Sequence, residues 1–292
     1  MDLNVKNLVK NFHAIARKKW IKGAYANNNI GNAGLTFEKE LNKEPDNTYF
    51  PDYEGIEIKC TTRYSDFPLF LFSASFDGPN YPEINRLIEK YGYYDVDFPD
   101  KKVLFEDINY ISKHIVNDKW IFRLEIDKNE DKLYLCVYDL NNKLVERESF
   151  VYLQTLYDHL ILKLKTLAVI KASKKIIDGE KYFRYYELSI YNIISFDKFL
   201  ELLEKRIIHV SLVGRISKSG ERYGKYRNKN LEFKIKKENI ELLFEKFYYY
   251  NYDSNITFKK RWLTTNHLFY FVPFHTCIKF HFIITTIFLS IN

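Results

Sequence analysis

The stretch Pro51-Asp52-Tyr53-Glu54-Gly55-Ile56-Glu57-Ile58-Lys59-Cys60 combines a turn, an alternating strand pattern and several charged side chains. Apolar and polar residues alternate over its second half, which is the period of a half-buried strand. Side chains two apart on a strand point to the same face. We therefore expect Glu57 and Lys59 to share one face and the two isoleucines to share the other, toward the core.

Asp52 precedes this strand, and Gly55 predicts a turn or bulge that brings Asp52 back beside Glu57. Two carboxylates and one lysine on a rigid strand can hold a hard divalent cation and position a water molecule. Phosphodiester hydrolysis requires that chemistry. Because short strings of this kind also occur on solvated strand faces, the motif needs support from its context.

A helix is expected just upstream, over Leu35–Leu41, after the turn-rich loop Asn27–Gly34. Leu35, Glu38 and Leu41 are spaced i, i+3, i+6, which places the glutamate on the same face as two leucines. A carboxylate that faces the core beside a metal motif would have a partner, as a buried charge requires. The alternative is a surface glutamate at the edge of an apolar stripe.

The run Gly31-Asn32-Ala33-Gly34-Leu35-Thr36-Phe37-Glu38, followed by Pro51-Asp52 and Gly55–Lys59, resembles the MvaI/BcnI-type restriction endonucleases. These enzymes are relatives of the mismatch-repair nicking enzyme MutH within the PD-(D/E)xK nucleases. The resemblance covers about residues 5 to 250, and this spread is more specific than the catalytic string alone. Its further segments are Pro68–Phe72, Leu87–Gly92, Tyr134–Asp139, Leu162–Lys165, Tyr182–Tyr186, Ser195–Leu200 and Ile235–Phe244.

The resemblance implies an α+β, restriction-endonuclease-like fold: a mixed central sheet flanked by helices, with a second α+β DNA-recognition lobe. It also implies a type II restriction enzyme that cuts double-stranded DNA with Mg²⁺, or Mn²⁺ in its place, leaving 5′-phosphate and 3′-hydroxyl ends. Asp52 and Glu57 would bind the metal, with the Ile58 carbonyl as a further ligand. Lys59 would orient the water and stabilise charge on the phosphate. Glu38 would be a second-metal ligand or a holder of metal-bound water.

The segment Arg215–Lys237 is the strongest candidate for DNA contact, because it holds nine basic residues against two acids. Gly220 and Gly224 allow the backbone close to a phosphate, and arginine can bond two acceptors on a guanine edge. A solvated loop without DNA contact is the alternative. The predicted DNA-binding residues are Arg215, Lys218, Arg222, Lys225, Arg227, Asn228, Lys229, Asn230 and Lys236.

In the resembled family this region approaches the bases, often through an Asp-His-Gly-like string before a phenylalanine. Here that place reads Asn228-Lys229-Asn230-Leu231-Glu232-Phe233, without the histidine. The family's target sequences therefore do not carry over to this chain.

We expect two lobes with a boundary near residue 165: a catalytic lobe over 1–165 and a DNA-recognition lobe over 166–250, followed by an atypical apolar tail over 251–292. Lys279 and Pro273 interrupt the tail, so a membrane span is not expected. The tail is then a degenerate terminus, an extra pair of strands packed on the core, or a membrane-associated segment, and the sequence does not decide between these alternatives. Expected helices cover 3–20, 152–168, 196–205 and 237–248; expected strands cover 54–60, 68–75, 119–127, 132–139, 169–177, 181–193, 207–216 and 231–236.

The net charge of +7 fits a polyanionic partner, here double-stranded DNA. Cys60, Cys136 and Cys277 show neither disulfide nor metal spacing, and the N-terminus shows no secretory signal, so we expect a cytoplasmic protein. By analogy with the resembled family we expect a monomer, and the interrupted tail predicts no membrane partner. A restriction enzyme also requires a methyltransferase that protects the host DNA, so we expect a companion DNA methyltransferase encoded nearby. The alternatives are a MutH-like mismatch-repair nicking enzyme and a catalytically dead DNA-binding relative.

Overall fold

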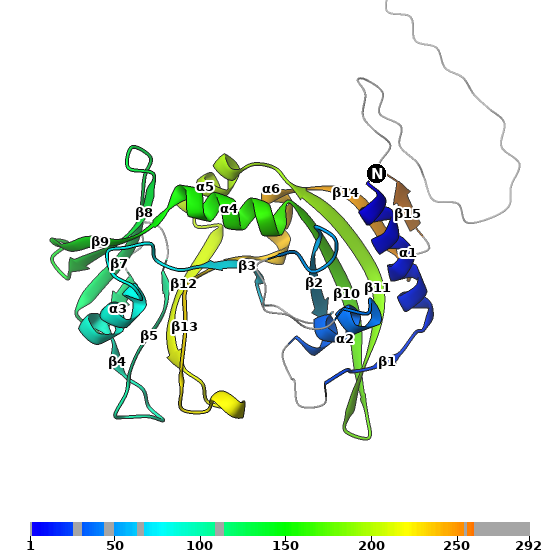
Figure 1. Ribbon diagram of the computed structural model, residues 1–292, viewed down its shortest axis with the longest axis horizontal. Helices are drawn as coiled ribbons and strands as arrows, with labels where there is room; N and C mark the ends of the chain where they lie inside the picture. Colours follow the sequence, from blue (N-terminus) through cyan, green and yellow to red (C-terminus); the bar gives the residue numbers. More distant parts are fainter. Residues whose placement is uncertain are drawn as a thin grey trace, which may run out of the picture. The chain divides into compact units, whose positions relative to one another are not determined.

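The computed structural model describes residues 2–25, 31–43, 50–62, 67–108, 114–253 and 256–259 (Figure 1). The chain divides into two units, 1–259 and 260–292. The second unit, and with it most of the predicted tail 251–292, lies outside the described residues. No helix in the described ranges is long and apolar enough to cross a membrane.

A six-stranded sheet carries the carboxylate motif, in the order β15-β14-β11-β10-β2, with β1 also paired to β11. Its strands are β1 (Ile21–Lys22), β2 (Glu57–Thr62), β10 (Thr166–Ile177), β11 (Glu180–Ile193), β14 (Phe244–Asn251) and β15 (Ile256–Lys259). β2 runs parallel to β10, whereas the other pairs are antiparallel. The sheet is therefore mixed, as predicted.

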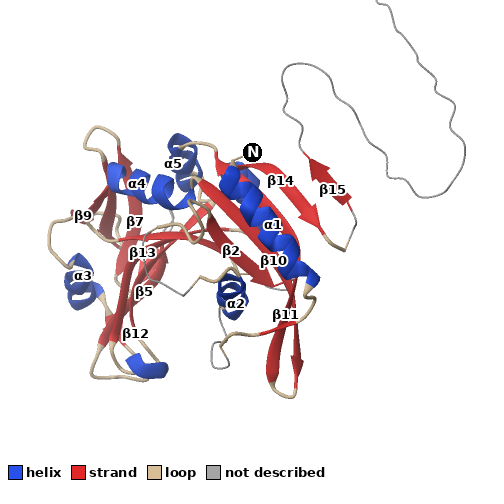
Figure 2. Ribbon diagram, turned by 45° about the vertical axis from the view of Figure 1, so that its right-hand side comes forward, coloured by secondary structure: helices blue, strands red, loops and turns tan. Residues whose placement is uncertain are grey.

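Two helices, α1 (Leu3–Arg17) and α2 (Asn32–Glu40), pack on this sheet (Figure 2). The buried apolar residues of α1 recur every three or four positions, and they share a core with Ile56 and Ile58. On α2, the Phe37 ring meets the Tyr185 ring edge-on, with 5.0 Å between centroids. The Tyr185 hydroxyl also donates a 2.7 Å hydrogen bond to the carbonyl of Ala33. These contacts fix α2 against β11 of this sheet.

A second sheet has the order β3-β13-β12-β5-β4, and a third is the meander β6-β7-β8-β9. The second comprises β3 (Leu69–Ala74), β4 (Tyr93–Tyr94), β5 (Lys102–Ile108), β12 (Ile208–Ile216) and β13 (Tyr226–Ile235). The third comprises β6 (His114–Val116), β7 (Trp120–Asp127), β8 (Lys132–Asp139) and β9 (Leu144–Tyr152). One apolar core joins these sheets to α3 (Glu83–Tyr91), α4 (Leu153–Leu164) and α5 (Phe196–Glu204).

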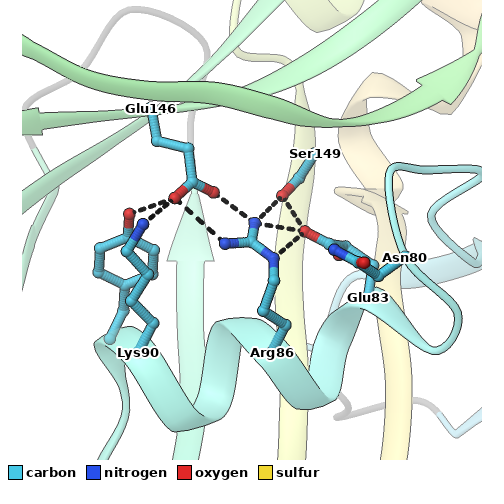
Figure 3. A network of polar contacts seen from close by, with 7 residues as sticks. Asn80, Glu83, Arg86, Lys90, Glu146 and Ser149 are labelled. Atoms are coloured by element: carbon cyan, nitrogen blue, oxygen red, sulfur yellow. Dashed lines mark hydrogen bonds and ion pairs between the residues drawn. The ribbon is translucent and has the colours of Figure 1, made fainter.

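A buried polar network ties α3 to β9 (Figure 3). The Arg86 guanidinium pairs with both Glu83 and Glu146 and donates to the Ser149 hydroxyl at 3.1 Å. Burial alone would raise the pKa of Glu146, but hydrogen bonds, with that from Arg86 the strongest, hold it at about 2. Because α3 also packs directly on Gly214 of β12, the network fixes one sheet against another.

Both larger sheets join strands from either side of residue 165, since β2 pairs with β10 and β3 pairs with β13. The sheets therefore do not divide the chain at that position. A catalytic role for 1–165 and a DNA-recognition role for 166–250 stay predictions about function.

The predicted helix over 237–248 is wrong. Only the 3₁₀ turn η2 (Lys237–Asn239) and the short helix α6 (Ile240–Leu243) form there, and Phe244–Asn251 continues as β14. The aromatic run Phe247–Tyr250 is typical of strands, and β14 pairs along β11. The helix over 196–205 is confirmed as α5, with the Ser195 hydroxyl accepting from the backbone N–H of Lys198 at 3.0 Å.

Candidate active site

Asp52 is brought to β2 by a tight turn at Glu54-Gly55, whose φ angles are 44° and 86°. Tyr53 and Ile56 flank the turn and exchange backbone hydrogen bonds of 2.9 and 2.7 Å. Positive φ at both central residues is typical of a type I′ turn, which glycine favours. The Asp52 Oδ2 then accepts a 2.9 Å hydrogen bond from the backbone N–H of Ile58. The turn predicted at Gly55 is confirmed, and it folds Asp52 back on the strand.

Glu57 begins β2 and is only 1% exposed. Its Oε1 is ion-paired with Lys59 and lies 3.6 Å from the Nζ of Lys163 on α4. Its Oε2 is buried and has no hydrogen-bond partner among the described residues. Burial raises the pKa of Glu57, the neighbouring Lys59 lowers it, and the carboxylate of Asp52 raises it further. Glu57 and Lys59 thus lie together on one face, as predicted.

Glu38 lies on α2 beside the same strand. A Cβ at Gly34 would lie 3.7 Å from Glu38 Oε1 and 3.8 Å from the Cβ of Cys60, which are ordinary van der Waals distances, so this part of α2 lies close to β2. Burial raises the pKa of Glu38, and Asp52 adds to that rise, while Lys43 and Lys59 oppose it. These charges place Glu38 in the electrostatic field of the site.

The predicted orientation of α2 needs a correction. Its buried residues are Asn32, Ala33, Thr36 and Phe37, whereas Leu35 and Leu41 are half-buried, as is Glu38. Glu38 therefore borders the apolar face and does not lie within a leucine stripe. The reason is the close approach of Ala33 and Phe37 to Tyr185, which sets the rotation of the helix.

The carboxylates of Asp52 and Glu57 fit a hard divalent cation, because Glu57 Oε2 is a buried acceptor without a donor. In the described part of the chain, no three or more His, Cys, Asp or Glu side chains are arranged to hold a metal ion. The side chains would thus supply two carboxylates, and the main chain, water and substrate phosphate would supply the rest. Magnesium in phosphate chemistry is commonly bound in that way. Lys43 Nζ stands 3.7 Å from Asp52 Oδ1 at the edge of the site.

The predicted DNA-binding segment is a β-hairpin of β12 and β13, with the 3₁₀ turn η1 (Gly220–Arg222) in its loop. The register places Arg215 directly opposite Arg227. A pocket of about 580 Å³ lies beside the two arginines, with Tyr94 and Phe105 in its wall. The exposed members of the predicted set are Lys218, Arg222, Lys225, Arg227, Lys229 and Lys236.

A loop between β4 and β5 holds this hairpin. Lys218 Nζ lies 2.6 Å from a carboxylate oxygen of Asp97 and 3.4 Å from one of Asp95. Lys101 Nζ donates a 2.7 Å hydrogen bond to the carbonyl of Gly224. Lys218 is therefore ion-paired within the protein, and a phosphate would compete with these two aspartates for its ammonium group.

The two asparagines of the predicted set are engaged inside the protein. Asn228 donates a 2.8 Å hydrogen bond to the side-chain oxygen of Asn85 on α3, and Asn230 donates one of 3.1 Å to the Ser75 hydroxyl. Arg227, beside Asn228 in the strand, is exposed. The arginine is thus available to a ligand, whereas each asparagine already uses one donor of its side-chain amide within the protein.

Sequence reasoning missed Lys163, Lys43 and the aspartates of the β4–β5 loop. The leucine pattern of the predicted helix over 152–168 indicates only that Lys163 does not lie on the apolar face of that helix. Its approach to Glu57 depends on the pairing of β10 with β2, which spans more than a hundred positions along the chain and leaves no local signal.

The model of the MvaI/BcnI restriction endonuclease family matches residues 9–244. Among solved structures, the chain is similar to the restriction endonuclease MvaI in complex with its cognate DNA substrate, with a TM-score of 0.76 and 25% identity over 84% of this chain and 98% of that chain. It is also similar to MvaI in the absence of DNA, with a TM-score of 0.53 and 22% identity over 84% of this chain and 97% of that chain. A search of curated proteins gave no match. The family match spans the turn, the strand and the basic hairpin described above, and the chain belongs to the MvaI/BcnI restriction endonuclease family.

Proposed function

We propose that this protein is a type II restriction enzyme that cuts double-stranded DNA at a specific sequence with Mg²⁺, and that Mn²⁺ can replace Mg²⁺. Membership of a restriction endonuclease family supports a site-specific nuclease. The observation that carries the metal requirement is the buried Glu57 Oε2, an acceptor without a partner beside a second carboxylate.

Asp52 and Glu57 would bind the metal, with the Ile58 carbonyl as a further ligand. The hydrogen bond from the Ile58 N–H fixes the Asp52 carboxylate and leaves its Oδ1 for the ion. When bound, Mg²⁺ supplies a Lewis acid and lowers the pKa of a coordinated water. Lys59 would orient the attacking water and stabilise the negative charge that develops on the phosphate. Glu38 would hold metal-bound water from the side of α2 or bind a second metal ion. The products would be 5′-phosphate and 3′-hydroxyl ends.

The hairpin of β12 and β13 would bind the DNA. The similar MvaI structure contains cognate DNA, which supports DNA as the ligand. We assign base reading to Arg227 and Arg215, and phosphate contact to Arg222, Lys225, Lys229 and Lys236. Lys218, Asn228 and Asn230 would also contact the DNA, in competition with their partners within the protein.

We further propose a cytoplasmic monomer whose companion DNA methyltransferase is encoded nearby and protects the host DNA. Cys60 and Cys136 are free thiols, which fits a reducing compartment. If no methyltransferase gene lies nearby, the MutH-like nicking enzyme becomes the better proposal.

Plasmid cleavage tests this proposal. The wild-type protein should cut plasmids with Mg²⁺ and not with EDTA, and Asp52→Ala should abolish cutting. Glu54→Gln is the matched control, because it removes an exposed carboxylate two residues away from Asp52 and should leave cutting intact. Absence of Mg²⁺-dependent cutting by the wild type, together with retained DNA binding, would favour the catalytically dead relative.

A further inference from the structure

A second lysine lies against the buried carboxylate of the candidate active site. Lys163 Nζ is 3.6 Å from Glu57 Oε1, the same oxygen that Lys59 contacts. The lysine side chain is 21% exposed and the glutamate side chain 1% exposed, so the pair is largely shielded from water. The roles assigned above leave Lys163 without a function.

The backbone fixes Lys163 over the start of β2. It lies in the last turn of α4, which ends at Leu164, and β10 begins two residues later at Thr166. In the parallel pairing, Leu167 of β10 stands opposite Glu57. Because helix and strand are joined without a loop, the register that aligns β10 with β2 also carries Lys163 to Glu57.

Lys59 has two tasks that conflict. In the structure it neutralises Glu57 Oε1, but as the residue that orients the water and contacts the phosphate it has to turn away from that oxygen. A buried carboxylate that loses its counterion is strongly disfavoured. Mg²⁺ bound at Oε2 would offset the charge of Glu57, but Oε1 would be left buried without a donor when Lys59 moves to the water and the phosphate. Lys163 Nζ is in position to take the place of Lys59 at Oε1.

We propose that Lys163 is a positioning residue, which holds Glu57 Oε1 and so keeps Oε2 directed to the metal and frees Lys59 for the water and the scissile phosphate. This inference rests on the proposed nuclease function. The separation of 3.6 Å between Lys163 and Glu57 is longer than a hydrogen bond, so the contact can shorten when Lys59 leaves. Lys43 does not have the same role at Asp52, because its Nζ lies 3.7 Å from Oδ1, the oxygen assigned to the metal.

The test compares Lys163→Met and Lys163→Arg with Lys165→Met, which removes an exposed charge at the end of the same helix. Single-turnover cleavage at saturating Mg²⁺ and DNA should fall by about 10- to 100-fold in Lys163→Met, the usual cost of losing a residue that orients a metal ligand. DNA affinity without metal should not change, Lys163→Arg should recover much of the rate, and Lys165→Met should match the wild type. A Lys163→Met rate equal to that of the wild type would overturn the proposal.

A second measurement separates positioning from general stability and needs no activity. In metal-free urea denaturation, Lys163→Met should lower the midpoint in the wild-type background and not in the Glu57→Gln background, because the contact exists only with the glutamate charge. Equal shifts in both backgrounds would overturn the proposal. If the wild type does not cut DNA, the nuclease proposal fails. The comparison of Lys163→Met in the wild-type and Glu57→Gln backgrounds would still decide whether Lys163 holds Glu57.

Discussion

Substituting Glu146 by Gln removes the charge on which Arg86, Lys90 and Tyr91 converge (Figure 3). Burial would raise the pKa of Glu146, but hydrogen bonds from these three side chains hold it at about 2, against an ordinary value of 4.5. At about 1.36 kcal/mol per pKa unit, the difference corresponds to about 3 kcal/mol of folding free energy at neutral pH. We therefore expect Glu146→Gln to lower the free energy of unfolding by about 3 kcal/mol, as for other broken buried ion pairs.

Urea denaturation at several pH values measures this effect. Between pH 4.5 and about pH 2, Glu146 binds fewer protons in the folded protein than in the unfolded chain. The stabilisation is therefore fully present above pH 4.5 and is lost as the pH falls through that interval. Wild type and variant should therefore converge in acid. Glu148→Gln, an exposed control on the same strand, should change stability by less than about 0.5 kcal/mol. Equal losses in both variants, or a difference between wild type and Glu146→Gln that persists in acid, would show that the charge of Glu146 does not stabilise the fold in this way.

Three further outcomes are expected. Glu57→Gln should abolish cleavage and raise the unfolding free energy of the metal-free protein at neutral pH, because burial raises the pKa of Glu57 and its charge costs stability as the pH rises through that pKa. Denaturation curves with no gain would contradict this. Arg227→Ala should relax recognition at about one or two base positions, with a loss of about 1–3 kcal/mol of discrimination against the wrong base. Lys236→Ala should instead weaken binding equally for all DNA sequences and reduce the slope of log affinity against log salt concentration by about one. Competition binding against a sequence library separates the two effects. Asp97→Asn removes the nearer partner of Lys218 and should steepen the salt dependence of DNA binding, and an unchanged slope would mean that Lys218 does not reach the DNA.

Local patterns predicted the strand of the candidate site and its turn. The alternation from Ile56 to Lys59 and the glycine at position 55 are properties of neighbouring residues, and the structure has the expected faces and the expected return of Asp52. The Ser195 cap was predicted for the same reason, since its hydrogen bond reaches only three residues along the chain.

Long-range pairing decided what the sequence could not show. The run Phe244–Asn251 follows a short helix and forms a strand because it pairs with β11, and that partner is not visible in the run itself. The burial of Glu57 depends on α4 and β10, which follow it by about a hundred positions. The aspartates that hold Lys218 likewise lie on a different hairpin, so local charge counting overstated the free charge of the basic loop.

Sequencing the ends that the protein produces on a mixed DNA library with Mg²⁺ tests whether it is a metal-dependent, sequence-specific nuclease. We expect cuts at one short sequence, with 5′-phosphate and 3′-hydroxyl ends, and none with EDTA or with Asp52→Ala. Ends spread without regard to sequence, or an equal number of cuts by Asp52→Ala, would contradict this expectation.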